Sequence, residues 1–346
     1  MSALTSPRRI LLARTDRLGD VILSTPVATA LKAAFPGVHL TFLVRRYAAD
    51  IPRCHPDVDE TLELDGSEIG GSAHQLARAL AARRFDAAIA LHPRPWLAWA
   101  LWRARIPLRI GTGYRWYSFL FNRRVREHRK TAERHEAEYN LGLLRPLGIS
   151  QAPVVFHFEL PPEEEAAAAR KLAALGVAQR PVVLHPSSGG SSREWPPERY
   201  GELAGLIASS GQAQVVLVGE AGEADLHRSI QERSGGLSLA GHLSVRELAV
   251  LLRRAAVLAG NSSGPLHLAV ALGTPVVTFF PPIRACRPER WGPYGRREDV
   301  LMSQEEECYR CRRGRGAAAR TCACMEAIPA RAAWEKVKEH LTARSP

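Results

Sequence analysis

Residues 9–44 read RILLARTDRLGDVILSTPVATALKAAFPGVHLTFLV, and this stretch decides the fold. Residues 9–14 form a short apolar run that predicts a buried strand, and residues 15–19 form a turn that contains Gly19. We expect a helix from about residue 20 to residue 35, ended by Pro36 and Gly37, and a second strand over residues 39–44. Strand, turn, helix and strand make a βαβ unit, which implies a parallel sheet. A further strand is expected over residues 84–91.

The same alternation restarts near residue 180 and predicts a second half of similar architecture. Strands are expected over residues 181–184, 214–218, 256–259 and 276–280, and helices over residues 197–209, 245–254 and 264–272. A hinge near residues 160–165, with Pro161 and Pro162, divides the chain into domains 1–162 and 163–328. Residues 329–346 hold a last helix that could pack back on either half, the N-terminal one included. We therefore predict an α/β fold of two Rossmann-like parallel-sheet domains facing each other across a cleft, with ligands at the carboxyl ends of the strands.

Composition is that of an ordinary globular protein, with 46% hydrophobic and 24% charged residues in a chain of 346. No secretory signal and no apolar stretch long enough to span a bilayer is visible, so we expect a cytoplasmic protein. The net charge is +12, and ten basic residues against two acidic ones lie between Arg103 and Arg134. Such a cluster attracts polyanions, although a solvated basic surface is an equal alternative.

The loop after the first strand reads DRLGD, residues 16–20, at the edge of the sheet where ligands bind. Gly19 would let the backbone come close to a ligand. Asp20 is a candidate general base facing the cleft. An N-cap for the following helix is the alternative role for an isolated aspartate at this position.

Two loops of the second half have the composition of phosphate-binding loops. Residues 185–196 read HPSSGGSSREWP, so that Ser187, Ser188, Gly189 and Gly190 expose backbone N–H groups beside the cation Arg193. Residues 260–269 read GNSSGPLHLA, in which Ser262, Ser263 and Gly264 begin a helix that carries His267. A helical histidine without partners is more often structural than catalytic. Glu223, after the strand at residues 214–218, is a candidate for hydrogen bonds to a ribose, or an ordinary helix-start glutamate.

Four motifs together resemble glycosyltransferase family 9, the bacterial heptosyltransferases that use ADP-heptose in lipopolysaccharide synthesis. They are RTDRLGDVILSTP at residues 14–26, HPSSG with Arg193-x-Trp-Pro at residues 185–196, GNSSGPLHLA followed by ALGTP at residues 260–275, and His135-Glu136 with Leu141, Leu144, Leu147 and Gly148. The resemblance extends from about residue 9 to about residue 338.

The resemblance implies two domains in the GT-B arrangement, with the acceptor on the N-terminal half and the nucleotide-diphosphate sugar on the C-terminal half. It implies transfer with inversion and without a metal or other cofactor, and Asp20 then deprotonates the acceptor hydroxyl. Arg193 matches the basic residue at the diphosphate, Glu223 an acidic residue near the nucleoside, and the N–H groups of Ser263 and Gly264 help to hold the phosphates. General-base help and fixed positive charge at the leaving group are the expected sources of catalysis.

One position departs from the family pattern. Ser262 stands where the family usually carries an aspartate that contacts the donor sugar. The acceptor is expected to be a lipopolysaccharide core or a related acidic glycan, and Arg115, Arg123 and Arg124 are the candidates for binding it. Another nucleotide-sugar, or a non-catalytic glycan binder, remains an alternative on the strength of Ser262. Nucleic acid is not an expected partner, because no recognition motif accompanies the charge.

Two further clusters leave alternatives open. The cysteines Cys308, Cys311, Cys322 and Cys324 could bind a structural zinc ion, or lie reduced in an arginine-rich loop. Trp96, Trp99 and Trp102 recur at helical spacing beside arginines. They are either part of the core or a patch for peripheral contact with the inner face of the cytoplasmic membrane.

Overall fold

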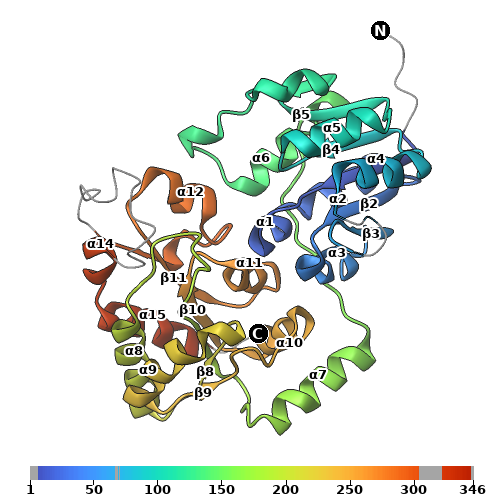
Figure 1. The fold of residues 1–346 in the computed structure, drawn as a ribbon. Helices are drawn as coiled ribbons and strands as arrows, with labels where there is room; N and C mark the ends of the chain where they lie inside the picture. Colours follow the sequence, from blue (N-terminus) through green and yellow to red (C-terminus); the bar gives the residue numbers. More distant parts are fainter. Residues whose placement is uncertain (1–6, 67–68, 70, 304–321, 344–346) are drawn as a thin grey trace. The chain divides into compact units, whose positions relative to one another are not determined.

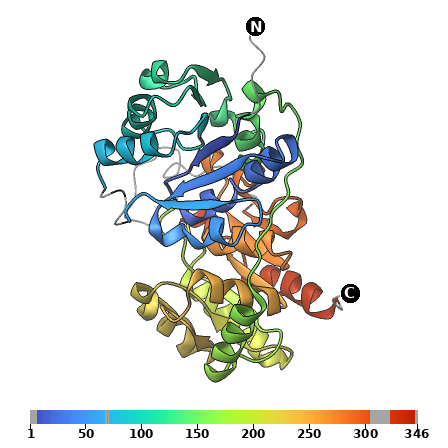
Figure 2. The ribbon, with the colours of Figure 1, turned by 90° about the vertical axis from the view of Figure 1, so that its right-hand side faces the viewer.

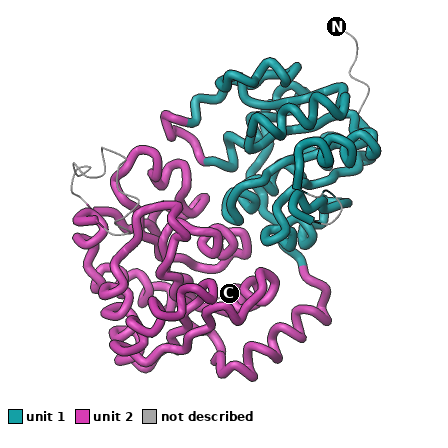
Figure 3. Tube along the Cα trace, viewed as in Figure 1, with its two compact units in different colours: residues 1–129, 136–159 teal, residues 130–135, 160–346 magenta. Residues whose placement is uncertain are grey.

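The computed structural model describes residues 7–66, 69, 71–303 and 322–343, and these form two compact units. Unit 1 contains residues 1–129 and 136–159, and unit 2 contains residues 130–135 and 160–346 (Figure 3). The expected hinge near residue 160 falls close to one border. The sequence does not reveal that residues 130–135 belong to unit 2.

Unit 1 is built on a parallel sheet of six strands in the order β3-β2-β1-β4-β5-β6 (Figure 1). The strands are β1 (Arg9–Ala13), β2 (His39–Val44), β3 (Glu60–Glu63), β4 (Ala87–Ala90), β5 (Leu108–Thr112) and β6 (Arg123–Val125). The helices are α1 (Leu18–Ile22), α2 (Pro26–Ala34), α3 (Asp50–Arg53), α4 (Ala73–Ala82), α5 (Pro95–Arg103) and α6 (Glu136–Gly142). Short 3₁₀ helices are η1 (Arg46–Ala48), η2 (Trp116–Leu120) and η4 (Arg145–Leu147), and η3 (Arg129–Thr131) crosses the border to unit 2.

The apolar run of β1 is buried on both faces of this sheet, as parallel strands require. Leu11 and Ala13 join a core with Leu76 and Leu80 of α4 and Leu97 of α5. Ile10 and Leu12 are equally buried and alternate to the other face. Helices α2 and α6 pack against each other, and Figure 2 gives a second view of the unit.

The helix expected over residues 20–35 is in fact two helices, because Pro26 lacks the N–H that would bond to the Ile22 carbonyl. The Thr25 hydroxyl donates to that carbonyl at 2.9 Å, and the Ser24 hydroxyl donates to the Asp20 carbonyl at 2.7 Å. The first helix also begins earlier than expected, at Leu18. Asp20 therefore lies inside the first turn, and the alternative of Asp20 as an N-cap is wrong.

Unit 2 repeats the architecture with a parallel six-stranded sheet in the order β12-β11-β10-β7-β8-β9. Its strands are β7 (Val182–His185), β8 (Val215–Leu217), β9 (Leu237–Ser238), β10 (Val257–Asn261), β11 (Val276–Phe280) and β12 (Val300–Met302). Its helices are α7 (Pro162–Ala174), α8 (Pro197–Ser210), α9 (Ala224–Ser234), α10 (Val245–Arg254), α11 (Gly264–Ala271), α12 (Pro288–Trp291), α14 (Ala323–Glu326) and α15 (Ala330–Thr342). Short 3₁₀ helices are η5 (Ala221–Glu223), η6 (Arg284–Cys286) and η7 (Arg297–Asp299). The two parallel sheets confirm the predicted Rossmann-like α/β fold.

The last helix belongs to the core of unit 2. Ala330, Ala333 and Val337 of α15 are buried in one cluster with Val182 of β7 and Ile207 of α8. Of the two options left open by the sequence, the structure thus shows packing on the C-terminal half, because the apolar face of this helix is covered by unit 2. No helix in the described part of the chain is long and apolar enough to cross a membrane.

Candidate functional site

Arg14, the residue after β1, is the centre of a buried ionic cluster in unit 1. Its side chain is only 3% exposed, and its guanidinium contacts Asp16 (Nε to Oδ1, 2.7 Å), Asp20 and Glu136 (Nη1 to Oε1, 3.3 Å). Asn140 Oδ1 accepts a further hydrogen bond from Arg14 at 3.3 Å. A buried arginine is tolerated because its donors meet carboxylates, and a planar guanidinium can hold several of them in fixed directions.

Glu136 is fixed by a second cation. Its side chain is 1% exposed, and Oε1 pairs with Arg129 as well as with Arg14. Arg129 Nη2 also donates to Asn140 Oδ1 at 3.2 Å, while Asn140 Nδ2 donates to the Leu23 carbonyl at 3.0 Å. Helix α6 thus ties the end of α1 to the loop after β1, and the Asp20 carboxylate is held by a preformed scaffold.

Burial raises the pKa of the Asp20 carboxyl above its ordinary value, and the nearby charges of Asp16 and Glu136 add to this effect, although the Arg14 guanidinium opposes it. His92 follows β4, and its Nδ1 lies 3.4 Å from Asp16 Oδ2. Burial, with the charges of Arg14 and Arg94, lowers the pKa of His92 to about 4, so the ring is neutral at pH 7. A carboxylate with a raised pKa at the carboxyl end of a strand is suited to accept a proton near neutral pH.

In unit 2 the loop after β7 is organised around a buried glutamate. Ser187 and Ser188 are buried, and the Ser188 N–H and hydroxyl both donate to Glu194 Oε1, at 2.7 and 2.8 Å. Gly189 and Gly190 have φ of +56° and +73°, a conformation that side chains rarely adopt. The two glycines therefore allow the loop to turn back sharply after Ser188. Arg193 follows in the same loop and is half-buried.

The loops after β7 and β10 are joined by side chains. The Asn261 side chain accepts from the Trp195 N–H at 2.9 Å and donates to the Pro186 carbonyl at 2.8 Å. Ser263 Oγ lies 3.0 Å from Nδ1 of His185, and the Ser191 hydroxyl donates to the Ser262 carbonyl at 2.9 Å. The structure thus brings together the two loops that the sequence predicts as phosphate-binding. Gly264 begins α11, so the start of a helix faces this junction.

His267 is buried in α11, and burial with the charge of His135 lowers its pKa to about 3. His135 Nε2 lies 3.0 Å from the Gly292 carbonyl, and its ring packs against Tyr294 at 5.0 Å. The His267 ring is therefore neutral at pH 7, and His135 is a packed side chain.

Glu223 is half-buried at the start of α9, and its Oε2 accepts from the Glu220 N–H at 2.9 Å. Part of its carboxylate therefore satisfies the backbone, as the ordinary helix-start alternative expects. The charge of Glu223 also acts on the buried rings of His185 and His227, which places it beside the end of β7.

The remaining predicted residues lie elsewhere. Arg115, Arg123 and Arg124 are exposed, and no contact among the described residues links them to Asp20. Trp96 and Trp99 pack against the unit 1 core, whereas Trp102 is 49% exposed, so the core interpretation holds for the first two. Cys308 and Cys311 lie outside the described residues. Cys324 is buried and Cys322 is half-buried beside the unit 2 core. The part of the chain that the structure describes holds no group of three metal-ligating side chains.

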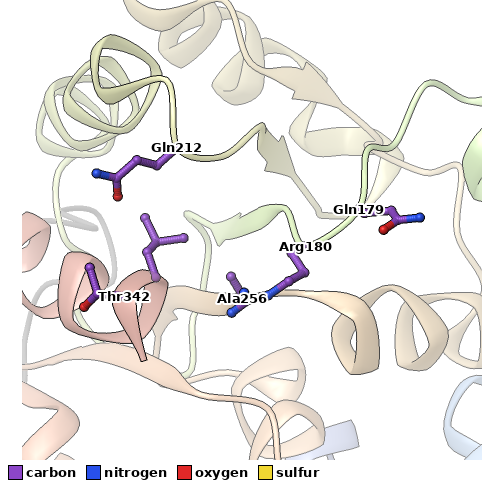
Figure 4. A pocket seen from close by; sticks show the side chains of 6 residues that line it. Gln179, Arg180, Gln212, Ala256 and Thr342 are labelled. Carbon is purple, nitrogen blue, oxygen red and sulfur yellow. The ribbon is translucent and has the colours of Figure 1, made fainter. Parts of the chain in front are cut away.

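A hollow of about 500 Å³ in unit 2 lies away from these loops (Figure 4). Its lining includes Gln179 and Arg180 before β7, Gln212 before β8 and Ala256 before β10. These residues mark the amino edge of the parallel sheet, whereas His185 and Asn261 mark the carboxyl edge. The hollow is therefore not part of the candidate site.

Sequence reasoning did not assign a role to Arg14 or Glu136, although both fall within the quoted motifs. They are separated by 122 positions along the chain, and only the fold brings them together. The usable signal was the position of Arg14 at the end of a buried strand, since a charge there needs a partner.

Known proteins resemble this chain over most of its length. A model of glycosyltransferase family 9 (heptosyltransferase) matches residues 73–319. A Haemophilus influenzae relative is 26% identical over 304 residues, covering 82% of this chain and 86% of the relative. Lipopolysaccharide heptosyltransferase 1 of Escherichia coli K12 is 23% identical over 323 residues, covering 86% and 94%.

Two solved structures have the same fold. A glycosyltransferase family 9 protein from Veillonella parvula superposes with a TM-score of 0.80 at 21% identity, covering 97% of this chain and 98% of that one. An Escherichia coli heptosyltransferase solved with ADP gives a TM-score of 0.70 at 21% identity, covering 96% and 99%.

Proposed function

This chain belongs to glycosyltransferase family 9, and we propose that it transfers heptose from ADP-heptose to an acidic acceptor of the lipopolysaccharide core, with inversion and without a metal. The family makes it a glycosyltransferase. The donor and acceptor are proposed from its relatives, several of which are named lipopolysaccharide heptosyltransferases. A related Escherichia coli structure holds an ADP-heptose analogue.

The observation that carries the proposal is the position of Asp20. Its carboxylate lies at the carboxyl end of β1, is held by the buried Arg14, and has a pKa raised by burial. In the proposed step Asp20 accepts the proton of an acceptor hydroxyl, and that oxygen forms the new bond to the anomeric carbon. The bond from that carbon to the diphosphate breaks, and the nucleotide diphosphate leaves with the electron pair. Attack opposite the leaving group inverts the anomeric centre.

Unit 2 supplies the groups proposed to hold the donor. Ser187, Ser188, Gly189 and Gly190 form the loop after β7, and Arg193 adds a cation for the diphosphate. Ser263 and Gly264 begin α11, whose first N–H groups favour negative charge. Glu223 is proposed to lie near the nucleoside. Stabilising the negative charge of the leaving diphosphate is the contribution expected from this set.

In unit 1 the acidic groups of the acceptor need basic partners. Arg115, Arg123 and Arg124 are exposed and lie in a region without acidic residues, so they are the candidates. Ser262 supports a second proposal, a different donor sugar, because it lacks the carboxylate that the family usually places there.

The test replaces the proposed base while keeping its shape. In Asp20→Asn we expect the rate of transfer to fall by about 10²- to 10⁴-fold, because a neutral amide cannot take the proton. Binding of ADP-heptose, followed by the rise in melting temperature, should stay unchanged. A variant that transfers heptose at the original rate would remove Asp20 from the mechanism. If another nucleotide-sugar raises the melting temperature and ADP-heptose does not, that other sugar is the donor and the proposed donor is wrong.

A further inference from the structure

Two large aromatic side chains of unit 1 project into solvent between β5 and β6. Trp116 is 79% exposed and Phe119 is 64% exposed, and both lie on the 3₁₀ helix η2. Because a 3₁₀ helix has three residues per turn, side chains three positions apart stand on the same side. The pair is therefore a shared apolar surface and not two isolated side chains.

The other side of η2 holds this surface in place. Tyr117 and Ser118 are buried, and the Tyr117 hydroxyl donates to the Pro93 carbonyl at 2.7 Å. The Ser118 hydroxyl donates to the Thr112 carbonyl at 2.6 Å and accepts from the Arg115 N–H at 3.0 Å. Phe121, the next inward residue, is fully buried in the core. The exposed aromatic groups are thus presented by an anchored segment, so little conformational freedom is lost when they bind.

The same part of the chain is strongly basic. Between Asp86 and Glu127 there are eight arginines and no aspartate or glutamate. Arg115, Arg123 and Arg124 are exposed, and no carboxylate of the described residues pairs with them. Arg123 and Arg124 lie on β6, which is the edge strand of the sheet. Arg123 donates to the Asn122 carbonyl and Arg124 to the Phe121 carbonyl, and neutral carbonyls leave the two positive charges uncompensated.

We propose that this surface, defined by Arg115, Trp116, Phe119, Arg123 and Arg124, docks onto a bilayer that contains anionic lipid. Tryptophan and phenylalanine enter the boundary between headgroups and acyl chains, and arginines bind lipid phosphates with paired N–H donors. Both chemistries occur together here within residues 115–124. The inference does not rest on the proposed sugar transfer, and it assigns to lipid phosphates the three arginines that the proposed function offers to the acceptor. It also moves the contact away from Trp96 and Trp99, which pack against the core.

The experiment is co-sedimentation of the full chain with phosphatidylcholine vesicles, with and without phosphatidylglycerol, in the absence of donor and acceptor. We expect binding to vesicles that contain phosphatidylglycerol and weaker binding as salt is raised. In the double variant Trp116→Ser/Phe119→Ser the partition coefficient should decrease by about 10- to 100-fold, because two apolar side chains no longer enter the membrane. The triple variant Arg115→Gln/Arg123→Gln/Arg124→Gln should lose the preference for phosphatidylglycerol.

Leu206→Ser is the matched control, since Leu206 is 37% exposed on α8 of unit 2 and should not affect vesicle binding. Melting temperatures show whether each variant is folded. Equal vesicle binding by the double variant and the unchanged chain would overturn the proposal. So would binding of a soluble acidic oligosaccharide that needs the same aromatic residues while vesicles are ignored, since the surface would then be a glycan site. Neither result depends on whether heptose is transferred.

Discussion

Arg14 and its carboxylates form a cluster in which negative charge exceeds positive charge. Asp16, Asp20 and Glu136 contact one buried guanidinium, and a second arginine, Arg129, pairs with Glu136. Burial alone would lower the pKa of Arg14, but the three carboxylates raise it above its ordinary range, so it stays charged. The excess of carboxylates and the burial together leave Asp20 as a group that takes up a proton more readily than a free aspartate.

The acid limb of the pH–rate profile should show this. Because the pKa of Asp20 is raised, transfer should decline at a pH above the ordinary aspartate value of about 4 as the base becomes protonated. Arg14→Gln removes the charge that opposes the shift, so the limb should move to still higher pH. The measurement is kcat/KM against pH for the unchanged chain, for Arg14→Gln and for the control variant Arg14→Lys.

Arg14→Lys is the matched control, because it keeps a positive charge and should leave the limb close to its original position. Loss of the Arg14 charge also leaves buried carboxylates unpaired, at a cost of about 3–5 kcal/mol in unfolding free energy, so each variant is first checked by melting. An acid limb that Arg14→Gln leaves in place would show that Arg14 does not act on the base.

Ser262 offers a direct test of donor choice. It is half-buried, and its carbonyl already accepts from Ser191 at 2.9 Å, so a change of side chain does not remove that contact. If the pocket is built for heptose, Ser262→Asp restores a charged acceptor of the family type and should tighten ADP-heptose binding by about tenfold. Calorimetric titration measures this, with Ser262→Asn as the uncharged control. Weaker binding of ADP-heptose in the aspartate variant would favour a different sugar.

At the scale of elements, the loops proposed to hold the donor depend on the ends of β7 and β10. Trp195 stacks on Phe279 of β11 with ring centroids 3.9 Å apart, and its indole N–H donates to the Ile328 carbonyl at 2.9 Å. The loop that contains Arg193 is therefore fixed at its far end by the core. Asn261 joins the two ends of this loop, because its side chain donates to the Pro186 carbonyl and accepts from the Trp195 N–H.

Asn261→Ala should loosen that loop. The substitution leaves the Trp195 N–H and the Pro186 carbonyl without partners in a buried place, at about 1–3 kcal/mol for each group. We expect a lower free energy of unfolding and weaker ADP-heptose binding in the same variant, measured by urea titration and calorimetry. Ser229→Ala is the control, because its exposed hydroxyl bonds to the Leu226 carbonyl within α9 and should cost less than about 1 kcal/mol. Equal effects of the two substitutions would contradict the role of Asn261.

The sequence predicts strands that are apolar runs and helices whose apolar residues recur at helical spacing, and it misses elements with neither pattern. The strand at residues 276–280 and the helix at 245–254 agree with β11 and α10, and the last helix expected within residues 329–346 is α15. β6 is not predicted because its sequence, RRV, has no apolar run, and β9 is not predicted because it has only two residues. For such edge strands the pairing partner, and not the local pattern, decides the conformation.

The candidate site divides in the same way. Asp20, Arg193 and Ser263 follow from their place after strands, because parallel strands bring their carboxyl ends to one edge. The contacts of Glu136 with Arg14, and of Asn261 with Pro186 and Trp195, join residues far apart in the chain. No local pattern carries that information, so these supporting residues emerge only from the fold.

For the whole molecule, the two units are joined by a chain that passes between them after residues 129, 135 and 159. Consecutive residues are anchored in different units as a result. His135 contacts the Gly292 carbonyl and Tyr294 in unit 2, whereas Glu136 pairs with Arg14 and Arg129 in unit 1. The two neighbouring residues His135 and Glu136 thus make their contacts in different units, and the chain crosses from unit 2 to unit 1 between them.

Both units also bury neutral histidines, which makes the stability of the whole chain sensitive to acid. Burial is the first cause that lowers the pKa of His55 and His92 in unit 1 to about 4, and in unit 2 it lowers that of His185 to about 4 and that of His267 to about 3. A free histidine titrates near 6.5, so above that pH both states are neutral and the histidines have no effect. Below that pH the histidines of the unfolded chain bind protons while the buried ones of the folded chain stay neutral. The free energy of unfolding therefore falls until the pH reaches the pKa of the folded state.

We therefore expect the free energy of unfolding to drop as pH falls from about 6.5 towards 4, by about 1.4 kcal/mol per pH unit for each histidine that remains neutral in the fold. Urea titrations at pH 7, 6, 5 and 4 (about one unit apart) measure the slope. His267→Gln cannot take up a proton in either state and should flatten the slope by the share of one histidine. His74→Gln is the control, since His74 is exposed in the first turn of α4 and is not enclosed by the core. If His267→Gln does not change the slope of the unfolding free energy against pH, His267 takes up its proton in the folded chain despite its burial.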